Sequence, residues 1–281
     1  MIIYKKSASV QGFTVEQKAA NKNIGFVPTM GALHDGHLSL IKRSKNENDL
    51  TICSIYVNPT QFNNKEDFEK YPSTIENDLL LLEEAGCDVV FLPDSEEIYP
   101  QDFTKKYYEL GALDSILEGA FRQGHYQGVC MVVDRLIQII PAHMLYLGQK
   151  DYQQCMVLKK MITDANLDIN ITICDTIREE NGLAMSSRNK RLTEAERIRA
   201  GNIYKALKYI KDHWNLLPAK TLIDNAMQII KHAFMDIDYL EITDFQLNTI
   251  NDTIDKQLDA IVLVAVHLNG VRLIDNLILS N

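Results

Sequence analysis

Residues 24–43 read IGFVPTMGALHDGHLSLIKR, and this stretch indicates the architecture of the N-terminal part of the chain. The apolar run IGFVPT has the composition of a buried strand, and the residues from Gly36 onward have the spacing of an amphipathic helix. Gly31, His34, Gly36 and His37 lie at the turn between them. Glycines there let the backbone approach a bulky anion, and a helix N-terminus favours phosphate. The stretch therefore predicts an anion site at the carboxyl end of a strand.

The chain beyond this stretch continues to alternate between the two kinds of pattern. Strand-like runs at 50–57, 87–93, 143–148 and 168–176 alternate with helix-like runs at 73–84, 128–140 and 151–166. The helix at 73–84 is expected to open with a Ser/Thr cap and to end at Gly86. Alternation with Val/Ile-rich strands predicts an α/β fold, a Rossmann-like parallel sheet with helices on both faces.

The pattern changes after about residue 176. Two long helical stretches, roughly 193–213 and 219–235, precede a strand-like DYLEITD. Two apolar runs, AIVLVAVHL and VRLIDNLIL, are then joined by Asn269-Gly270, a strong hairpin signal. We therefore expect a first domain at 1–176 and a smaller α+β domain at 177–281.

Composition narrows the class of protein. The chain has 281 residues, a net charge of -9 and five scattered cysteines without a C-x-x-C pair. The acidic balance argues against nucleic-acid or anionic-membrane partners, and the cysteines read as reduced structural thiols. Neither a signal peptide nor an apolar run long enough to span a bilayer is evident, which predicts a soluble cytoplasmic protein.

Two motifs carry the candidate chemistry. His34 and His37 are one helical turn apart, so both imidazoles can donate to one phosphate group. Far downstream, IREENGLAMSSRN (177–189) offers two hydroxyls and a guanidinium on a glycine-containing loop, which suits phosphate binding. His-x-x-His could also be half of a metal site, but no further ligands with matching spacing follow, so no metal ligand is assigned.

Together the two motifs resemble the HIGH and KMSKS signatures of the adenylyl-transferring superfamily. Five blocks narrow the resemblance further: PTMGALHDGHLSL, YVNPTQF, LEGAFRQGHYQGV, LGQKDYQQ and IREENGLAMSSRN. In this order, over residues 28–189, they resemble the pantothenate synthetases (pantoate–β-alanine ligases). That resemblance implies ATP-dependent condensation of pantoate with β-alanine through a pantoyl adenylate, with Mg²⁺, in a homodimer.

The resemblance also implies roles for individual residues. Those implied at the ATP site are Met30, Gly31, Ala32, Leu33, His34, Asp35, Gly36, His37, Gly148, Gln149, Lys150, Asp151, Ile177, Met185, Ser186, Ser187 and Arg188. Among them His34, His37, Lys150, Ser186, Ser187 and Arg188 are the catalytic candidates. Gln61 and Gln154 are implied to bind pantoate and β-alanine, and Arg122 is a further pocket candidate beside a plain surface arginine.

Three residues depart from the family pattern: Gln149 replaces a common Glu, and Gln123 and Tyr126 replace a common Pro and Phe. None of the three removes an implied phosphate or pantoate ligand.

Two alternative functions stay open at this point. One is another small-metabolite nucleotidylyltransferase of the same superfamily, and the other is a catalytically silent nucleotide-binding protein. A class I tRNA synthetase is disfavoured by the short, acidic chain.

Overall fold

The structure is a computed structural model that describes residues 1–63, 65–250 and 259–279. It divides into two compact units. The first comprises Met1–Gly148 and Gln154–Asp175, and the second comprises Gln149–Gln153 and Thr176–Asn281. The short segment Gln149–Gln153 thus groups with the C-terminal part of the chain, whereas the domain boundary at 176/177 remains a prediction from sequence.

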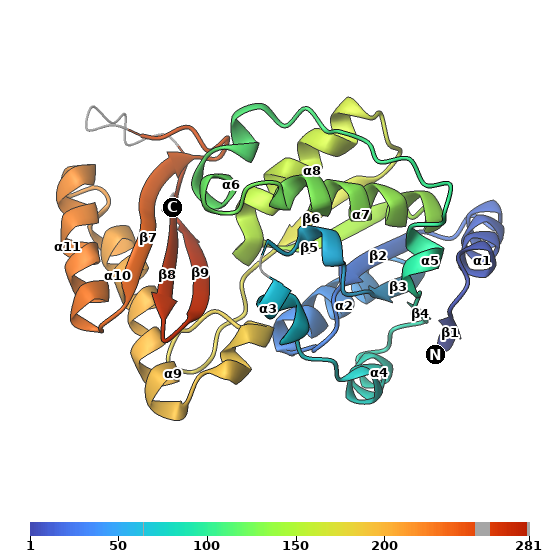
Figure 1. Cartoon of the computed structure of the whole chain (residues 1–281), viewed down its shortest axis with the longest axis horizontal. Coiled ribbons are helices and arrows are strands. Elements are labelled where there is room, and N and C mark those ends of the chain that lie inside the picture. Colours follow the sequence, from blue (N-terminus) through green and yellow to red (C-terminus); the bar gives the residue numbers. More distant parts are fainter. Residues whose placement is uncertain (64, 251–258, 280–281) are drawn as a thin grey trace. The chain divides into compact units, whose positions relative to one another are not determined.

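The first unit is built on a six-stranded parallel sheet (Figure 1). Its strands, in sheet order, are β1 (Ile2–Tyr4), β4 (Val89–Phe91), β3 (Leu50–Ile55), β2 (Ile24–Thr29), β5 (Met144–Gly148) and β6 (Asn170–Cys174). Apart from the edge strand β1, the chain order runs outward from β2 in both directions, so the sheet reverses between β2 and β5. Ligands of open parallel sheets bind at the carboxyl ends of strands at such a reversal.

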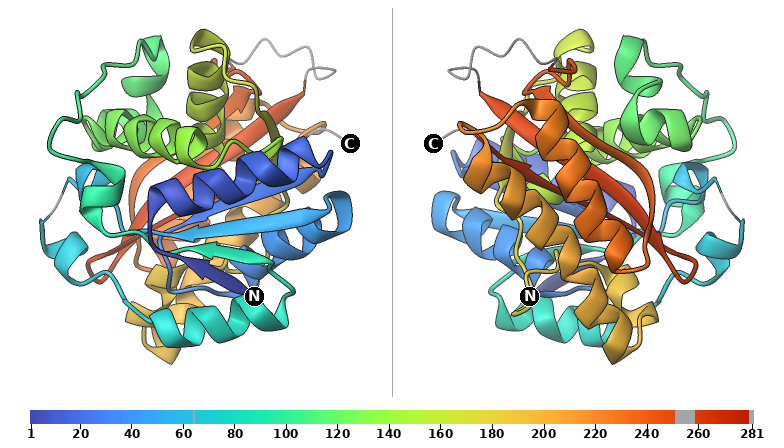
Figure 2. Two further views of the ribbon diagram at one scale, coloured as in Figure 1. Left: turned by 90° about the vertical axis from the view of Figure 1, so that its right-hand side faces the viewer. Right: turned by 90° about the vertical axis from the view of Figure 1, so that its left-hand side faces the viewer.

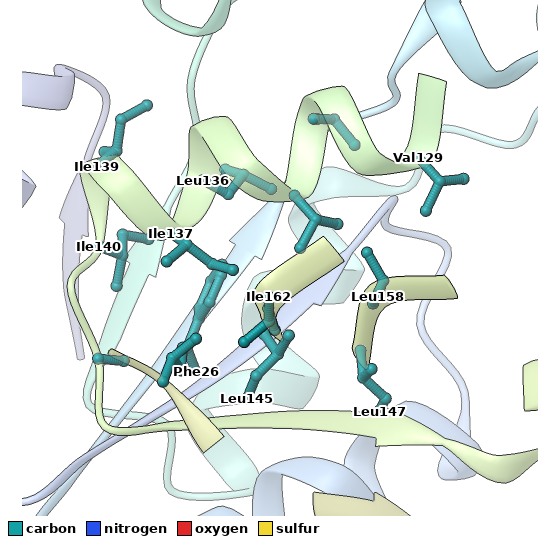
Figure 3. Packing of buried hydrophobic residues seen from close by; sticks show 14 of the residues in the cluster. Phe26, Val129, Leu136, Ile137, Ile139, Ile140, Leu145, Leu147, Leu158 and Ile162 are labelled. Atoms are coloured by element: carbon teal, nitrogen blue, oxygen red, sulfur yellow. The ribbon is translucent and has the colours of Figure 1, made fainter. Parts of the chain in front are cut away.

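Both faces of this sheet are covered. Helices α1 (Ser7–Ala19), α7 (His125–Ile139) and α8 (Tyr152–Asp164) pack on one face, and α2 (Asp35–Glu47) and α4 (Ile75–Glu84) pack on the other (Figure 2). Because side chains alternate along a strand, Phe26 joins the first cluster and Val27 the second. Figure 3 shows the first cluster, in which Phe26 and Leu145 lie beneath Leu136 and Ile137 of α7.

Several short elements of this unit lie outside the predicted pattern. They are α3 (Lys65–Glu69), α5 (Ser95–Ile98), α6 (Leu117–Phe121) and the 3₁₀ turns η1 (Pro59–Gln61) and η2 (Gly111–Asp114). The expected Ser/Thr at the start of α4 is confirmed, since Thr74 is the N-cap residue, but its side chain makes no cap bond to the backbone. Its hydroxyl instead donates to Asp78 Oδ1 at 3.0 Å. The expected end at Gly86 is confirmed by its φ of 79°.

The second unit holds a three-stranded antiparallel sheet of β7 (Asp236–Asp244), β8 (Ala260–Leu268) and β9 (Val271–Ile278). Helices α10 (Asn202–His213) and α11 (Ala219–His232) pack against it through one apolar cluster. The Asn269-Gly270 hairpin is confirmed, with φ of 47° and 76°. The stretch predicted as one helix at 193–213 is two helices, since α9 (Glu194–Ala200) ends at Gly201.

A Cβ at Gly201 would lie 2.9 Å from the carbonyl oxygen of Asn181, so the break between α9 and α10 coincides with a close backbone approach.

The predicted fold class is confirmed: a parallel sheet with helices on both faces, and a smaller α+β part. Two further short turns, η3 (Gln149–Asp151) and η4 (Ser187–Arg191), carry candidate site residues of the second unit.

Candidate active site

The loop after β2 has the tight turn that its glycine predicts. Gly31 has a φ of 78° and Ala32 a φ of 50°, both left-handed. A Cβ at Gly31 would lie 3.0 Å from Asp78 Oδ2 and 3.1 Å from Ile55 Cγ2. Any side chain at this position would thus be strained by its backbone and crowded by its neighbours. The loop then enters α2 at Asp35.

Asp78 of α4 holds this loop in place. Its fully buried carboxylate accepts hydrogen bonds from the backbone N–H groups of Ala32 and Leu33, both at 2.8 Å. Hydrogen bonds to a charged acceptor are stronger than neutral ones. Asp78 was not predicted from the sequence, although the sequence contains a signal for it. Asp78 lies three residues after Ile75 and four before Leu82, where an amphipathic helix would place an apolar residue.

The two histidines lie together at the start of α2. Their ring centroids are 4.1 Å apart, with ring planes inclined by 43°. His34 is the N-cap residue, and its Nδ1 accepts from the Gly36 N–H at 3.2 Å. A nitrogen that accepts carries no proton, so in the neutral His34 ring the proton is on Nε2. The backbone oxygen of His34 accepts from the His37 N–H at 2.8 Å. The backbone N–H groups of Gly36 and His37, both in the first turn of α2, are therefore hydrogen-bonded to His34.

Gln61 lies beside this loop. Its Nε2 donates to the Met30 thioether sulfur at 3.1 Å, and its Oε1 accepts from Asn58 Nδ2 at 3.2 Å. Asn58 is buried, and its Oδ1 caps η1 by accepting from the Thr60 N–H at 3.3 Å. The structure therefore brings together Met30 and Gln61, which lie 31 residues apart in sequence.

Helix α7 packs against η1 with almost no space between them. A Cβ at Gly128 would lie 2.4 Å from the carbonyl oxygen of Thr60 and 2.9 Å from the Gln61 Cα. Asn58 Nδ2 donates to the Gly128 carbonyl oxygen at 3.1 Å. His125 Nδ1 lies 2.8 Å from the Gln61 carbonyl oxygen, so this nitrogen is the donor. Gly128 and His125 fix where Gln61 stands, and neither was singled out from the sequence.

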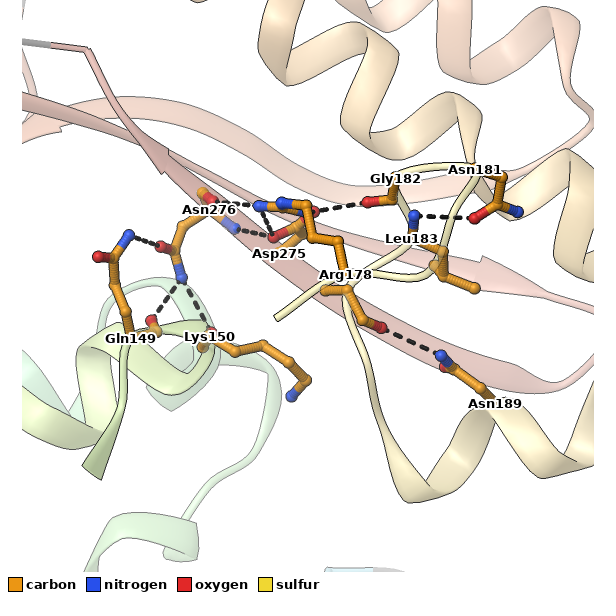
Figure 4. A network of polar contacts seen from close by, with 10 residues as sticks. Gln149, Lys150, Arg178, Asn181, Gly182, Leu183, Asn189, Asp275 and Asn276 are labelled. Carbon is orange, nitrogen blue, oxygen red and sulfur yellow. Dashed lines mark hydrogen bonds and ion pairs between the residues drawn. The ribbon is translucent and has the colours of Figure 1, made fainter. Parts of the chain in front are cut away.

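In the second unit, the backbone of Gln149 and Lys150 is held by Asn276 of β9 (Figure 4). Asn276 Nδ2 donates to the carbonyl oxygens of Gln149 at 2.8 Å and Lys150 at 2.9 Å. Gln149 Nε2 donates back to Asn276 Oδ1 at 3.1 Å. The Lys150 ammonium lies 3.3 Å from Asp151 Oδ2, with the lysine side chain 18% exposed and that of Asp151 45%. Asp151 is thus the more exposed partner of this ion pair, and the Lys150 side chain is mostly covered.

The loop at 177–189 is anchored within the same unit. Arg178 forms a bidentate pair with buried Asp275, NH1 to Oδ2 at 2.6 Å and NH2 to Oδ1 at 3.0 Å. Burial raises the pKa of the Asp275 carboxyl, an effect that Arg178 opposes. Buried Asn189 donates to the Ala184 carbonyl oxygen at 3.0 Å, and Ser186 Oγ accepts from the Arg188 N–H at 3.3 Å. The hydroxyls and guanidinium therefore stand on a firmly held turn.

The predicted site residues fall into two groups, one in each unit. The first unit holds Met30 to His37, Gln61, Gly148 and Gln154, and the second holds Gln149, Lys150, Asp151, Ile177 and Met185 to Arg188. Gly148 ends β5, and half-buried Gln154 lies in the first turn of α8. Arg122 NH1 lies 3.6 Å from Glu118 Oε2, a buried carboxylate. The roles of these residues remain predictions.

Other candidate features have structural explanations. All five cysteines are free, four of them are buried, and burial raises the pKa of Cys87 and Cys130 to about 12. These thiols fit the predicted structural role. Across residues 1–63, 65–250 and 259–279, no group of three or more His, Cys, Asp or Glu side chains is placed to hold a metal ion. Within the same ranges no helix has the length and apolar character needed to cross a membrane.

Comparison with known proteins gives a consistent result. A sequence model of the family described as pantoate–β-alanine ligase matches residues 2–278. The chain is 46% identical to the pantothenate synthetase of Cytophaga hutchinsonii over 270 residues, 94% of each chain. It is 43% identical to that of Thermotoga petrophila, covering 100% of both.

Solved structures agree with the sequence matches. The crystal structure of pantothenate synthetase from Thermus thermophilus superposes with a TM-score of 0.92 at 36% identity, covering 100% of each chain. The Francisella tularensis pantoate–β-alanine ligase, described as complexed with β,γ-ATP and β-alanine, gives a TM-score of 0.82 at 37% identity, covering 99% of this chain and 97% of that one.

Proposed function

The chain belongs to the pantoate–β-alanine ligase family and is a ligase, and from this premise we propose that it forms pantothenate through a pantoyl adenylate. A pantoate carboxylate oxygen would attack the α-phosphorus of ATP and expel diphosphate. The β-alanine amine would then attack the activated carbonyl, lose a proton and expel AMP. The product would serve coenzyme A synthesis as vitamin B5.

The observation that carries this proposal is the pair of imidazoles at the N-terminus of α2. Adenylyl transfer requires positioning and stabilisation of the charge that develops on the phosphate oxygens. The N–H groups of Gly36 and His37 are used within the turn, so the imidazoles of His34 and His37 are the better donors. The His34 ring, with its proton on Nε2, would donate from that atom, and the N-terminal end of the helix dipole adds a favourable field.

Pantoate is proposed to bind at Gln61 and Gln154. The Gln61 amide donates to a thioether, which is a weak acceptor. A pantoate carboxylate is a much stronger acceptor, so exchanging the Met30 sulfur for a carboxylate oxygen is favourable. The carbonyl end of the same amide remains held by Asn58, which keeps the side chain oriented.

Lys150 and the Ser186–Arg188 turn are proposed to hold the ATP phosphates. A lysine ammonium acts as a point charge, whereas the guanidinium of Arg188 can bind two phosphate oxygens at once. Mg²⁺ is proposed to enter with ATP, bound mainly by phosphate oxygens, because magnesium usually uses few protein ligands. When bound, it would neutralise the charge that develops on the leaving diphosphate.

We further propose that the enzyme is a homodimer and acts in the cytoplasm. The homodimer follows from the family resemblance alone. Light scattering of the purified full chain measures it: a mass near twice the 32.0 kDa of one chain is expected.

The function is tested with purified protein, Mg-ATP and the two substrates. Diphosphate release should require pantoate, and pantothenate and AMP should form once β-alanine is added. Incubations that omit pantoate, or replace it with a phosphorylated metabolite, separate this activity from that of another nucleotidylyltransferase. Absence of pantothenate from the complete mixture would rule the proposal out.

A further inference from the structure

Strand β9 places two neighbouring polar residues in contact with two different segments of the candidate nucleotide site. Successive side chains of a strand point to opposite faces. Asp275 bonds Arg178 at the start of the 177–189 loop, and Asn276 bonds the backbone of Gln149 and Lys150 (Figure 4). One strand near the C-terminus therefore touches both segments to which we assign phosphate binding.

The Asn276 amide is fully used in this arrangement. Nδ2 donates to two consecutive carbonyl oxygens, and Oδ1 accepts from Gln149 Nε2 at 3.1 Å. The side chain is buried, so these bonds face little competition from water. The residue before Asn276 reinforces its position: Asp275 Oδ1 accepts from the Asn276 N–H at 2.8 Å, and Arg178 NH2 donates to the Asn276 carbonyl oxygen at 3.2 Å.

The Asn276 backbone is thus held by Asp275 and Arg178, and the Asn276 side chain in turn holds the Lys150 backbone. We propose that Asn276 is a positioning residue that fixes the Gln149–Lys150 backbone and thereby aims the Lys150 ammonium at the ATP phosphates. This inference rests on the proposed function. A lysine side chain has four rotatable bonds, so its reach alone does not select one direction. A backbone pinned at two successive carbonyls gives the side chain a fixed origin, and small displacements in such sites reduce rates strongly.

The direct test is a double-mutant cycle between Asn276→Ala and Lys150→Ala in the full chain. Alone, Asn276→Ala is expected to lower kcat/KM for ATP about tenfold, as for the loss of one or two hydrogen bonds. The KM for pantoate should stay within about twofold. In the Lys150→Ala background, the same substitution should change kcat/KM for ATP less than about twofold, because its effect is transmitted through Lys150.

Asn202→Ala is the matched control. Asn202 Nδ2 also donates to a backbone carbonyl oxygen, that of Arg199 at 2.8 Å, at the junction of α9 and α10. This substitution removes the same chemical group from the same unit and should leave kcat/KM for ATP unchanged. Asn276→Ser, which keeps a single donor, should fall between wild type and Asn276→Ala. It also replaces Asn276→Ala as the test if the alanine variant does not fold.

The possible results separate a positioning role from a structural one. If Asn276→Ala lowers kcat/KM for ATP tenfold in both the wild-type and the Lys150→Ala protein, the inference is overturned, because an effect independent of Lys150 does not act through Lys150. No loss in either background would overturn it as well. If the wild-type protein makes no pantothenate, the proposed function fails independently. In that case the Kd for Mg-ATP is measured by calorimetric titration for the wild type, the two single variants and the double variant. A change in Kd caused by Asn276→Ala that disappears in the Lys150→Ala background supports the inference, and one that persists overturns it.

Discussion

Replacing Gly128 with alanine would push a methyl group into the backbone of η1. The new Cβ would lie 2.4 Å from the Thr60 carbonyl oxygen, 2.7 Å from its carbon and 2.9 Å from the Gln61 Cα. Ordinary contact begins near 3.4 Å, so η1 or α7 must move by about 1 Å. All three contacts are with main-chain atoms, which cannot rotate away as a side chain would.

The expected cost to stability is small, because two effects oppose each other. Overpacking of this kind costs about 1–3 kcal/mol, whereas alanine in place of glycine within a helix gains up to about 1 kcal/mol. The net loss is therefore about 0–2 kcal/mol. The cost to catalysis should be larger, since a displacement of about 1 Å of a substrate-positioning group can cost about 100-fold. Gln61, the proposed pantoate ligand, is the group that a movement of η1 would displace.

Steady-state kinetics and thermal unfolding together test this reasoning. Gly128→Ala should lower kcat/KM for pantoate about 100-fold while the KM for ATP stays within about threefold. Gly12→Ala is the matched control, because Gly12 lies in the middle of α1 with nothing within 4 Å of a new Cβ. That control should gain about 0.5–1 kcal/mol of stability without a change in activity. Wild-type kinetics for pantoate in Gly128→Ala would refute the link between η1 and substrate binding.

Four further substitutions test other parts of the account. His34→Asn keeps a good N-cap but removes the imidazole donor, so unfolding should change by less than about 0.5 kcal/mol while adenylation falls about 100-fold, measured by diphosphate release. His37→Ala should cost roughly 2.7–4 kcal/mol in the same assay, and an unchanged rate would contradict its role. Asp78→Asn leaves one loop N–H facing an amide NH₂ and should destabilise the protein by about 2–4 kcal/mol in urea unfolding. The Glu97 carboxylate accepts a hydrogen bond from the Ser7 N–H at 2.7 Å. This bond, together with a hydrogen bond from the Lys6 ammonium, lowers the pKa of the Glu97 carboxyl. Glu97→Gln should therefore lower the melting temperature at pH values above the ordinary pKa of 4.5, and this effect should vanish as the pH falls through the folded pKa; a gap that persists in acid would argue against the contact.

Sequence patterns predicted the architecture because each pattern reports a property that is local. Alternation of apolar runs identified β2 to β6 and the helices α2, α4, α7 and α8, and Asn269-Gly270 identified the hairpin. The short elements β1 and α5 lack enough residues to show a period. The break at Gly201 was missed for a different reason. It coincides with a carbonyl 20 residues earlier in the chain, that of Asn181, and no local pattern reports such a contact.

In the candidate site, too, some residues could be predicted from the sequence and others could not. The histidines, Gln61 and the Ser-Ser-Arg turn were found by their chemistry and by the family resemblance. The residues that hold them were not. Asp78 and Asn276 act through backbone N–H and carbonyl groups, which look identical at every position of a sequence. Gly128 acts by having no side chain at a crossing of α7 and η1, a property visible only once both elements are placed.

The central claim is that the chain activates pantoate by transferring an adenylyl group to its carboxylate. Pantoate labelled with ¹⁸O in both carboxylate oxygens tests this most directly, by mass spectrometry of the products after complete turnover with ATP and β-alanine. The attacking oxygen must remain on phosphorus when the amide forms, so AMP and pantothenate should each carry one ¹⁸O. Unlabelled AMP, or label found in inorganic phosphate together with ADP, would contradict the account.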